Sequence, residues 1–141
     1  DVITFASAIA GLAEGDILLT ADTVVVAGGA VLGKPADRDA AVDMLRRLSG
    51  REHEVITGVT LRDDERVRSF SARSQVRFRR LADEEIDYYV DNYRPMDKAG
   101  GYGIQEWIGY VGIEGIEGSF YNVMGLPVQR VYCELDAFVE E

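Results

Sequence analysis

The sequence has 141 residues, of which 47% are hydrophobic and 28% charged, and it carries a formal net charge of −10. This composition is typical of a folded globular domain and excludes a disordered chain. No apolar run approaches the roughly 20 residues of a membrane-spanning helix, and a chain this acidic would be repelled by a nucleic-acid backbone. We therefore expect one domain over residues 1–141 that binds neither membranes nor nucleic acid.

Cysteine and histidine usage narrows the possible chemistry. Cys133 is the single cysteine and His53 the single histidine, so the chain has neither an internal disulfide nor a zinc site of Cys/His type. We expect a reducing, cytoplasmic setting. His53 precedes an apolar alternating run and is interpreted as a structural residue, because it has no cysteine or second histidine to work with.

In chain order, the first expected elements are a helix and a strand. Four apolar residues recur at helical spacing before Gly15: Val2, Phe5, Ile9 and Leu12. Residues 17–26, ILLTADTVVV, are typical of a strand buried on both faces. The pair Gly28-Gly29 then predicts a tight turn into a short strand over residues 30–32.

A helix is expected between Asp37, as its N-cap, and Gly50, just past its end. Its buried face would carry Ala41, Met44, Leu45 and Leu48. Two long segments, residues 54–63 and 66–81, then flank an acidic turn and predict a β-hairpin. One face of the second strand would present Arg73, Arg77 and Arg79, which we interpret as a solvated face balanced by neighbouring acids rather than a nucleic-acid patch.

The second half of the chain combines helices with a glycine-rich stretch. Asp83 is the expected N-cap of a helix that Pro95 ends. Residues 96–125 should form ordered loop and strand, with WIGYVGI (107–113) as a strand-like piece. Pro127 opens a final helix whose expected inward residues are Val128, Val131, Tyr132, Leu135 and Phe138. Strands and helices interleave without strict alternation, which predicts an α/β fold with a mixed central sheet and flanking helices.

Asp22 is the first candidate for a functional residue. A carboxylate beside three valines costs several kcal/mol to bury unpaired, so it either faces a cleft at the strand or accepts hydrogen bonds in a turn. The residues alone leave both alternatives open. Lys34 lies on a stiff loop between Gly33 and Pro35, where it either serves the same cleft or is an ordinary surface lysine.

Two further segments carry polar side chains among glycines. MDKAGGYGIQ (96–105) contains Asp97, Lys98 and Gln105 and suits a close approach to phosphate, but no P-loop motif occurs in the chain. The segment before Pro127 contains Ser119 and Asn122, together with Glu117. Loop capping explains these residues as readily as catalysis does.

Several motifs in register carry a resemblance to one family. LTADTVVV, LGKP, LRRLSGREHEVITGV, MDKAGGYGIQ and IEGSFYNVMGLP match, in order and spacing, the Maf family of nucleoside triphosphate pyrophosphatases, from about Asp16 onward. The resemblance implies a fold similar to that of the inosine triphosphate pyrophosphatases, with a long sheet forming a cleft. It also implies a homodimer.

The resemblance assigns roles to particular residues. The catalytic aspartate of the family falls on Asp22, which would act as the base or hold the metal. The substrate-binding positions fall on Thr23, Lys34 and Gln105, and Lys98 matches the DKAG motif. A threonine and a glutamine at these positions are similar to the branch that prefers dTTP and UTP over methylated GTP.

The activity that the resemblance implies is hydrolysis of a nucleoside triphosphate to the monophosphate and pyrophosphate, in a house-cleaning role. It requires Mg²⁺ or Mn²⁺, because few local cations are available to meet the phosphates. Maf proteins open with a segment resembling Ser-x-Ser-Pro-Arg-Arg, and this sequence contains no such segment. We therefore expect an N-terminally incomplete Maf-like domain, and the alternative function is a non-catalytic nucleotide-binding or division-regulating interaction module.

Overall fold

Five strands form the sheet, in the order β2-β1-β3-β4-β5, in a computed structural model that describes residues 14–140. The strands are β1 (Leu18–Ala27), β2 (Ala30–Leu32), β3 (Glu52–Arg62), β4 (Val67–Phe78) and β5 (Ile113–Glu117). The helices are α2 (Arg38–Leu48), α3 (Asp83–Tyr93), α4 (Trp107–Gly112), α5 (Phe120–Met124) and α6 (Val128–Glu140), with short 3₁₀ turns η1 (Pro95–Asp97) and η2 (Ala99–Gly101). The helix expected around residues 2–12 lies outside the described residues.

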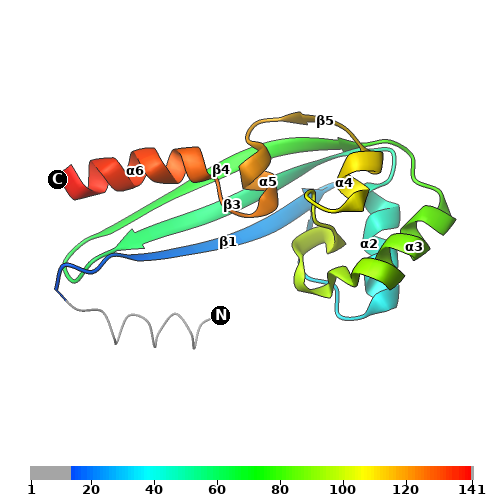
Figure 1. Cartoon of the computed structure of the whole chain (residues 1–141), viewed down its shortest axis with the longest axis horizontal. Helices are drawn as coiled ribbons and strands as arrows, with labels where there is room; N and C mark the ends of the chain where they lie inside the picture. The colour runs from blue at the N-terminus through cyan, green and yellow to red at the C-terminus, as the bar shows by residue number, and fades with distance from the viewer. Residues whose placement is uncertain (1–13, 141) are drawn as a thin grey trace.

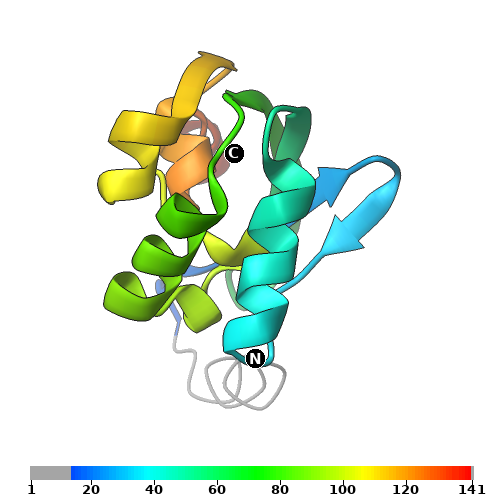
Figure 2. The same ribbon diagram turned by 90° about the vertical axis from the view of Figure 1, so that its right-hand side faces the viewer.

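The molecule is elongated along the three long strands (Figure 1). Helices α2, α3 and α4 gather at one end of the strands, α6 lies along the other end, and α5 lies between them. Within the first group, α2 and α3 run side by side (Figure 2). The predicted α/β class with helices flanking one central sheet is confirmed. The expected mixture of strand directions is not found among the described strands, because each of their pairings is antiparallel.

Strand β1 lies less deep than its apolar sequence indicates. The expectation of burial on both faces is wrong, because only Val25 of this strand is buried and Asp22 is exposed. The reason is its position: β2 pairs only with residues 25–27, so residues 18–24 have β3 as their one neighbour among the described strands. Apolar residues on an edge strand remain accessible from the unpaired side.

Local signals place α2 and the hairpin as expected. The Asp37 carboxylate accepts a hydrogen bond from the Ala40 N–H at 2.8 Å and caps α2. Strands β3 and β4 pair along their whole length. On their outer face Arg73 and Arg77 form ion pairs with acids of β3, Glu54 and Glu52, which confirms the interpretation of a solvated, charge-balanced face.

The start of α3 differs from the expectation. Ala82, not Asp83, is the N-cap residue, and its N–H donates to the Glu85 carboxylate at 2.9 Å. The Arg79 guanidinium binds the same carboxylate and lowers its pKa to about 2. Because the Glu85 carboxylate caps the start of the helix, Asp83 is not needed as the cap. It lies in the first turn, where it forms an ion pair with Arg46.

The segment 107–113 is not a strand. Residues 107–112 form α4, and β5 begins only at Ile113. Aromatic and β-branched residues favour strands, but tertiary packing decides here. Ile108 is fully buried, and a Cβ on Gly112 would lie 3.2 Å from side-chain atoms of Phe78 and Leu81, so the helix packs closely at this point.

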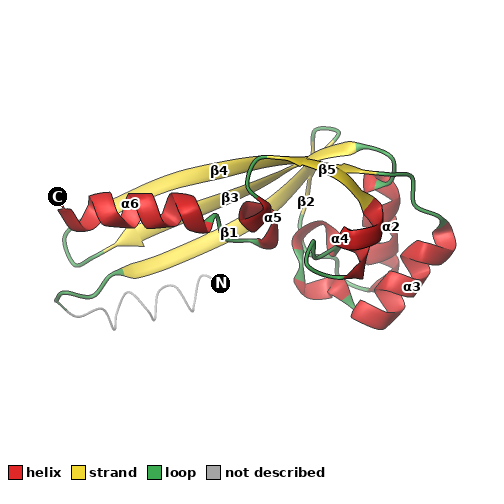
Figure 3. Ribbon diagram, turned by 45° about the horizontal axis from the view of Figure 1, so that its top comes forward, coloured by secondary structure: helices red, strands yellow, loops and turns green. Residues whose placement is uncertain are grey.

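Helix α6 packs against the long strands through fewer residues than expected (Figure 3). Val131 and Phe138 are buried, seven residues apart and therefore on one face. The expected inward position of Tyr132 is wrong, because its side chain is 74% exposed, and Val128 is exposed as well. No helix within residues 14–140 combines the length and the apolar character needed to cross a membrane.

Asn122 fastens α5 to the sheet. Its side-chain amide donates to the carbonyls of Val55 and Ala72, each at 3.2 Å, and to the Ser74 hydroxyl at 3.0 Å. Ser119 caps α5 by accepting from the Asn122 N–H at 3.2 Å. Ser119 and Asn122 therefore both make the structural contacts that loop capping requires.

We predict that Asn122→Ala lowers the free energy of unfolding by about 2–4 kcal/mol, because it removes the buried hydrogen bonds from α5 to β3 and β4 and also removes side-chain volume. Urea unfolding of both proteins measures this difference. The control is Asn92→Ala, which removes an exposed amide bonded to one carbonyl. A loss at Asn122 no larger than that at Asn92 would contradict the anchoring role.

Candidate functional site

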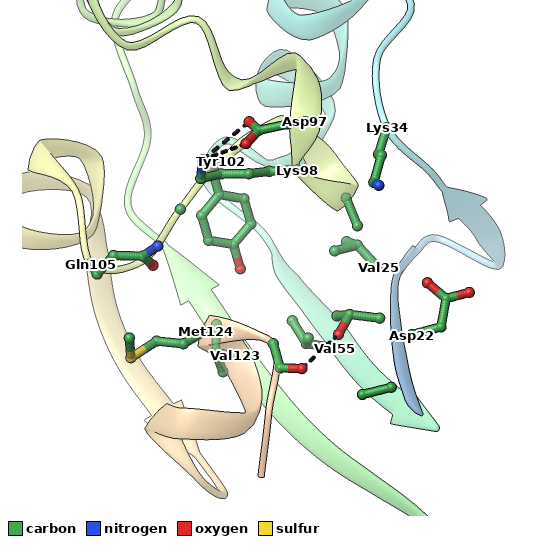
Figure 4. Close-up of a pocket in the computed structure, with 15 residues that line it drawn as sticks. Asp22, Val25, Lys34, Val55, Asp97, Lys98, Tyr102, Gln105, Val123 and Met124 are labelled. Carbon is green, nitrogen blue, oxygen red and sulfur yellow. Dashed lines mark hydrogen bonds and ion pairs between the residues drawn. The ribbon is translucent and has the colours of Figure 1, made fainter. Parts of the chain in front are cut away.

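A cleft of about 230 Å³ lies between β1, the loop after β2, the segment 97–105 and α5. All five residues selected from the sequence line it, and Figure 4 shows four of them by label. The lining residues are Ala21, Asp22, Thr23, Val25, Lys34, Val55, Asp97, Lys98, Ala99, Tyr102, Gly103, Gln105, Val123, Met124 and Gly125. Segments far apart in the sequence thus meet at one place.

A glycine seats the 97–105 segment on β1. The Gly100 N–H donates to the Gly33 carbonyl at 3.0 Å, which ties this segment to the loop that carries Lys34. Gly100 has a φ of +74°, and a Cβ there would lie 2.9 Å from Val25 Cγ2. Since a larger residue would be strained and would collide with β1, glycine lets the two loops close on the strand.

Asp22 lies at the rim of the cleft. Its Cα pairs with Gly58 of β3, so strand alternation places its side chain on the face opposite to Thr23 and Val25. It nevertheless lines the cleft from the exposed edge of β1, and Figure 4 shows Asp22 on the same side of the cleft as Lys34. Its carboxylate makes no hydrogen bond or ion pair with residues 14–140, so the turn alternative finds no support in the described chain.

Thr23 joins the sheet to α5. Its hydroxyl lies 2.9 Å from the Thr57 hydroxyl and donates to the Gly125 carbonyl at 3.3 Å. Gly125 follows α5 directly and also lines the cleft. The Thr23 side chain therefore holds the floor of the cleft to α5, whatever contact it makes with a ligand.

Lys98 is braced by two carboxylates. Its ammonium donates to Asp97 at 3.1 Å and lies 3.9 Å from Glu106, and it holds the pKa of Asp97 below the ordinary value. Glu106 in turn accepts from the Tyr89 hydroxyl at 2.7 Å, and that hydroxyl accepts from the Gly103 N–H at 2.9 Å. Burial raises the pKa of Tyr89, so this hydroxyl stays protonated and keeps the bond.

The described lining of the cleft has no net formal charge. Two lysines, Lys34 and Lys98, face two aspartates, Asp22 and Asp97. Residues 14–140 contain no group of three or more His, Cys, Asp or Glu side chains arranged to hold a metal ion. An anionic ligand in this cleft therefore needs positive charge beyond what the described lining supplies.

Sequence reasoning missed Tyr102 and the apolar wall. Tyr102 lines the cleft with Val25 and Met124, yet it is only 6% exposed, and its hydroxyl lies 2.6 Å from His53 Nε2. The sequence feature that could have identified Tyr102 is its position as an aromatic residue in a glycine-rich polar segment, three residues before Gln105. His53 is 4% exposed, and its ring stacks on Phe78 with the centroids 5.5 Å apart. These contacts confirm that His53 is a structural residue of the core.

The family model described as Maf-like protein matches residues 4–138. The chain belongs to this family. A relative from Porphyromonas gingivalis (strain ATCC 33277) is 60% identical over 127 residues, which are 90% of this chain and 64% of the relative. A relative from Bacteroides thetaiotaomicron is 60% identical over 121 residues, 86% of this chain and 63% of the relative. A third, from Parabacteroides distasonis, is 57% identical over 127 residues, 90% of this chain and 66% of the relative.

These three relatives carry the name dTTP/UTP pyrophosphatase, which confirms the resemblance to the Maf family and to that branch. The chain spans just under two thirds of the length of the curated relatives that it matches.

The buried imidazole predicts a pH dependence of stability. Burial lowers the pKa of His53 to about 4, whereas the unfolded chain protonates this ring near its ordinary pKa of about 6.5. Between these values the unfolded state binds more protons, so the free energy of unfolding falls as the pH falls from about 6.5 to 4, by roughly 3 kcal/mol. Urea unfolding of wild type and His53→Gln across this range measures it. A difference between the two proteins that stays constant with pH would contradict the burial of a neutral ring.

Proposed function

We propose that the protein hydrolyses dTTP, UTP or a related, possibly modified nucleotide to the monophosphate and pyrophosphate. The observation that carries the proposal is the convergence of Asp22, Lys34 and Lys98 on one cleft that also contains Gln105. The names of the relatives support the same substrates and the same reaction. The house-cleaning role that the family resemblance implies is part of the proposal.

The phosphates would lie between Asp22, Lys34 and Lys98. The two ammonium groups neutralise part of a triphosphate, but the two aspartates of the lining offset them. A divalent cation, Mg²⁺ or Mn²⁺, fits this balance, because such ions are often held by one or two carboxylates together with phosphate oxygens and water. Asp22, whose carboxylate has no partner among residues 14–140, would hold the ion. When bound, the ion would neutralise charge on the phosphate oxygens.

The chemical step follows from the position of Asp22. A water oxygen forms a bond to phosphorus, and the bond from phosphorus to the oxygen bridging the α and β phosphates breaks, so that pyrophosphate leaves with the electron pair. Asp22 would accept the proton of this water or, in its other proposed role, would hold the ion while the proton passes to solvent. Lys34 and Lys98 stabilise the negative charge on the leaving group, because catalysis of phosphoryl transfer depends mainly on stabilising charge in the transition state.

Gln105 would recognise the base. Its amide offers a donor and an acceptor, which suit the acceptor-donor edge of uracil or thymine. In Figure 4 Gln105 lies across the cleft from Asp22 and Lys34. A nucleotide with its phosphates beside Lys34 would therefore direct its base toward Gln105, over the floor that Thr23 holds.

We further propose that residues 1–141 act as one Maf-like domain, in the cytoplasm and as a homodimer. The continuous core between the sheet and α2, α3 and α4 supports one domain. The proposals of a homodimer and of a cytoplasmic location rest on the family resemblance. Analytical ultracentrifugation of the protein tests whether it is a dimer.

Product analysis separates this proposal from the alternative of a non-catalytic nucleotide-binding module. The protein is incubated with dTTP and Mg²⁺, and the products are separated. Monophosphate with pyrophosphate is the expected result. Diphosphate with phosphate indicates a different hydrolase, and nucleotide binding without any product favours the module.

Asp22→Asn keeps the shape of the side chain but removes its charge, and we expect it to lower kcat for dTTP at least about 100-fold. The matched control is Asp64→Asn, an exposed aspartate in the β3–β4 turn, which should hydrolyse dTTP like the wild type. Release of pyrophosphate measures both. Turnover of Asp22→Asn near that of the control would reject the assignment.

A further inference from the structure

Tyr102 and His53 form a buried pair at the wall of the cleft. Tyr102 lines the cleft, and its hydroxyl lies 2.6 Å from His53 Nε2 on β3. Both rings pack on Phe78, with centroids 5.0 Å and 5.5 Å from it. The packing fixes both rings, so the direction of the hydrogen bond depends on which nitrogen of His53 carries the proton.

The proton position follows from the other nitrogen. His53 Nδ1 is buried and has no hydrogen-bond partner among the described residues. A neutral imidazole has one N–H and one lone pair, and an orphaned buried N–H is rarer and more costly than an unused acceptor. The N–H therefore belongs on Nε2, where it donates to the Tyr102 oxygen.

This arrangement leaves the hydroxyl proton of Tyr102 without an acceptor among the described residues. The oxygen accepts from Nε2 with one lone pair and retains its own O–H. The structure gives this hydroxyl no other partner within residues 14–140. Figure 4 shows the Tyr102 ring directing its hydroxyl toward the space between Gln105 and Val55, across the cleft from Asp22 and Lys34.

We propose that Tyr102 is a substrate-binding residue whose hydroxyl donates a hydrogen bond to a carbonyl oxygen of the pyrimidine ring, and that His53 is the positioning residue that orients it. The inference rests on the proposed function, since it assumes that the cleft binds a pyrimidine nucleotide. The base carbonyl is chosen over a phosphate oxygen because Tyr102 lies on the Gln105 side, across the cleft from Asp22 and Lys34. Lys98 also lies beside Tyr102, so the test includes pyrophosphate. The Tyr102 hydroxyl would thus be a second hydrogen-bond donor to the base, beside the amide of Gln105.

The test compares Tyr102→Phe with wild type by calorimetric titration of UMP and, separately, of pyrophosphate. Tyr102→Phe keeps the ring and removes the donor. We expect the Kd for UMP to rise about tenfold and the Kd for pyrophosphate to stay unchanged. Tyr110→Phe, an exposed tyrosine outside the cleft, is the matched control and should bind both ligands like the wild type.

Equal weakening of UMP and pyrophosphate, or of neither, overturns the inference, and weakening of pyrophosphate alone would place the donor on a phosphate. These outcomes concern Tyr102 only, provided that the wild type releases pyrophosphate from UTP. A wild type that neither hydrolyses UTP nor binds UMP would instead reject the proposed function.

A second measurement needs no variant. His53 is the single histidine, so a protein labelled with ¹⁵N-histidine gives one pair of ring-nitrogen signals. At neutral pH we expect the protonated, pyrrole-type signal from Nε2 and the pyridine-type signal from Nδ1. The reverse pattern would make Tyr102 the donor to His53 and would overturn the proposal.

Discussion

The cleft depends on the contact between Gly100 and β1. Gly100 meets Val25 where no side chain fits, and its N–H reaches the Gly33 carbonyl at 3.0 Å. This one contact brings the lysine after β2 and the lysine before η2 to the same strand. A bulkier residue would push the loops apart and would separate Lys34 from Lys98, so a backbone constraint determines where the cations lie.

Asp22 lies in the part of β1 that has β3 as its one neighbour among the described strands, which explains how a carboxylate tolerates apolar neighbours. Val24, Val25 and Val26 supply the strand, while the accessible edge lets Asp22 stay in contact with solvent and with the cleft. Edge strands leave backbone and side chains reachable. Under the proposed function, a cation held by Asp22 would add the positive charge that this lining lacks, because Asp22 and Asp97 offset Lys34 and Lys98.

Local signals in the sequence were sufficient for part of the fold. The Asp37 cap and the alternation of β3 and β4 are short-range features, and both were predicted correctly. The helix at 107–112 and the outward Tyr132 depend on packing between distant segments, so periodicity misled at both places. In the cleft, polar residues in motifs were found, whereas Tyr102 resembled an ordinary core aromatic until its neighbours were placed.

The central claim is that one nucleotide spans the cleft from Lys34 to Gln105. A crystal structure with an α,β-methylene analogue of dTTP and Mg²⁺ tests it most directly, since the methylene bridge prevents hydrolysis. We expect phosphates beside Lys34 and Lys98, the ion on Asp22, and the base at Gln105 and Tyr102. Density for the analogue outside this cleft, with Asp22 and Lys34 left uncontacted, would contradict it.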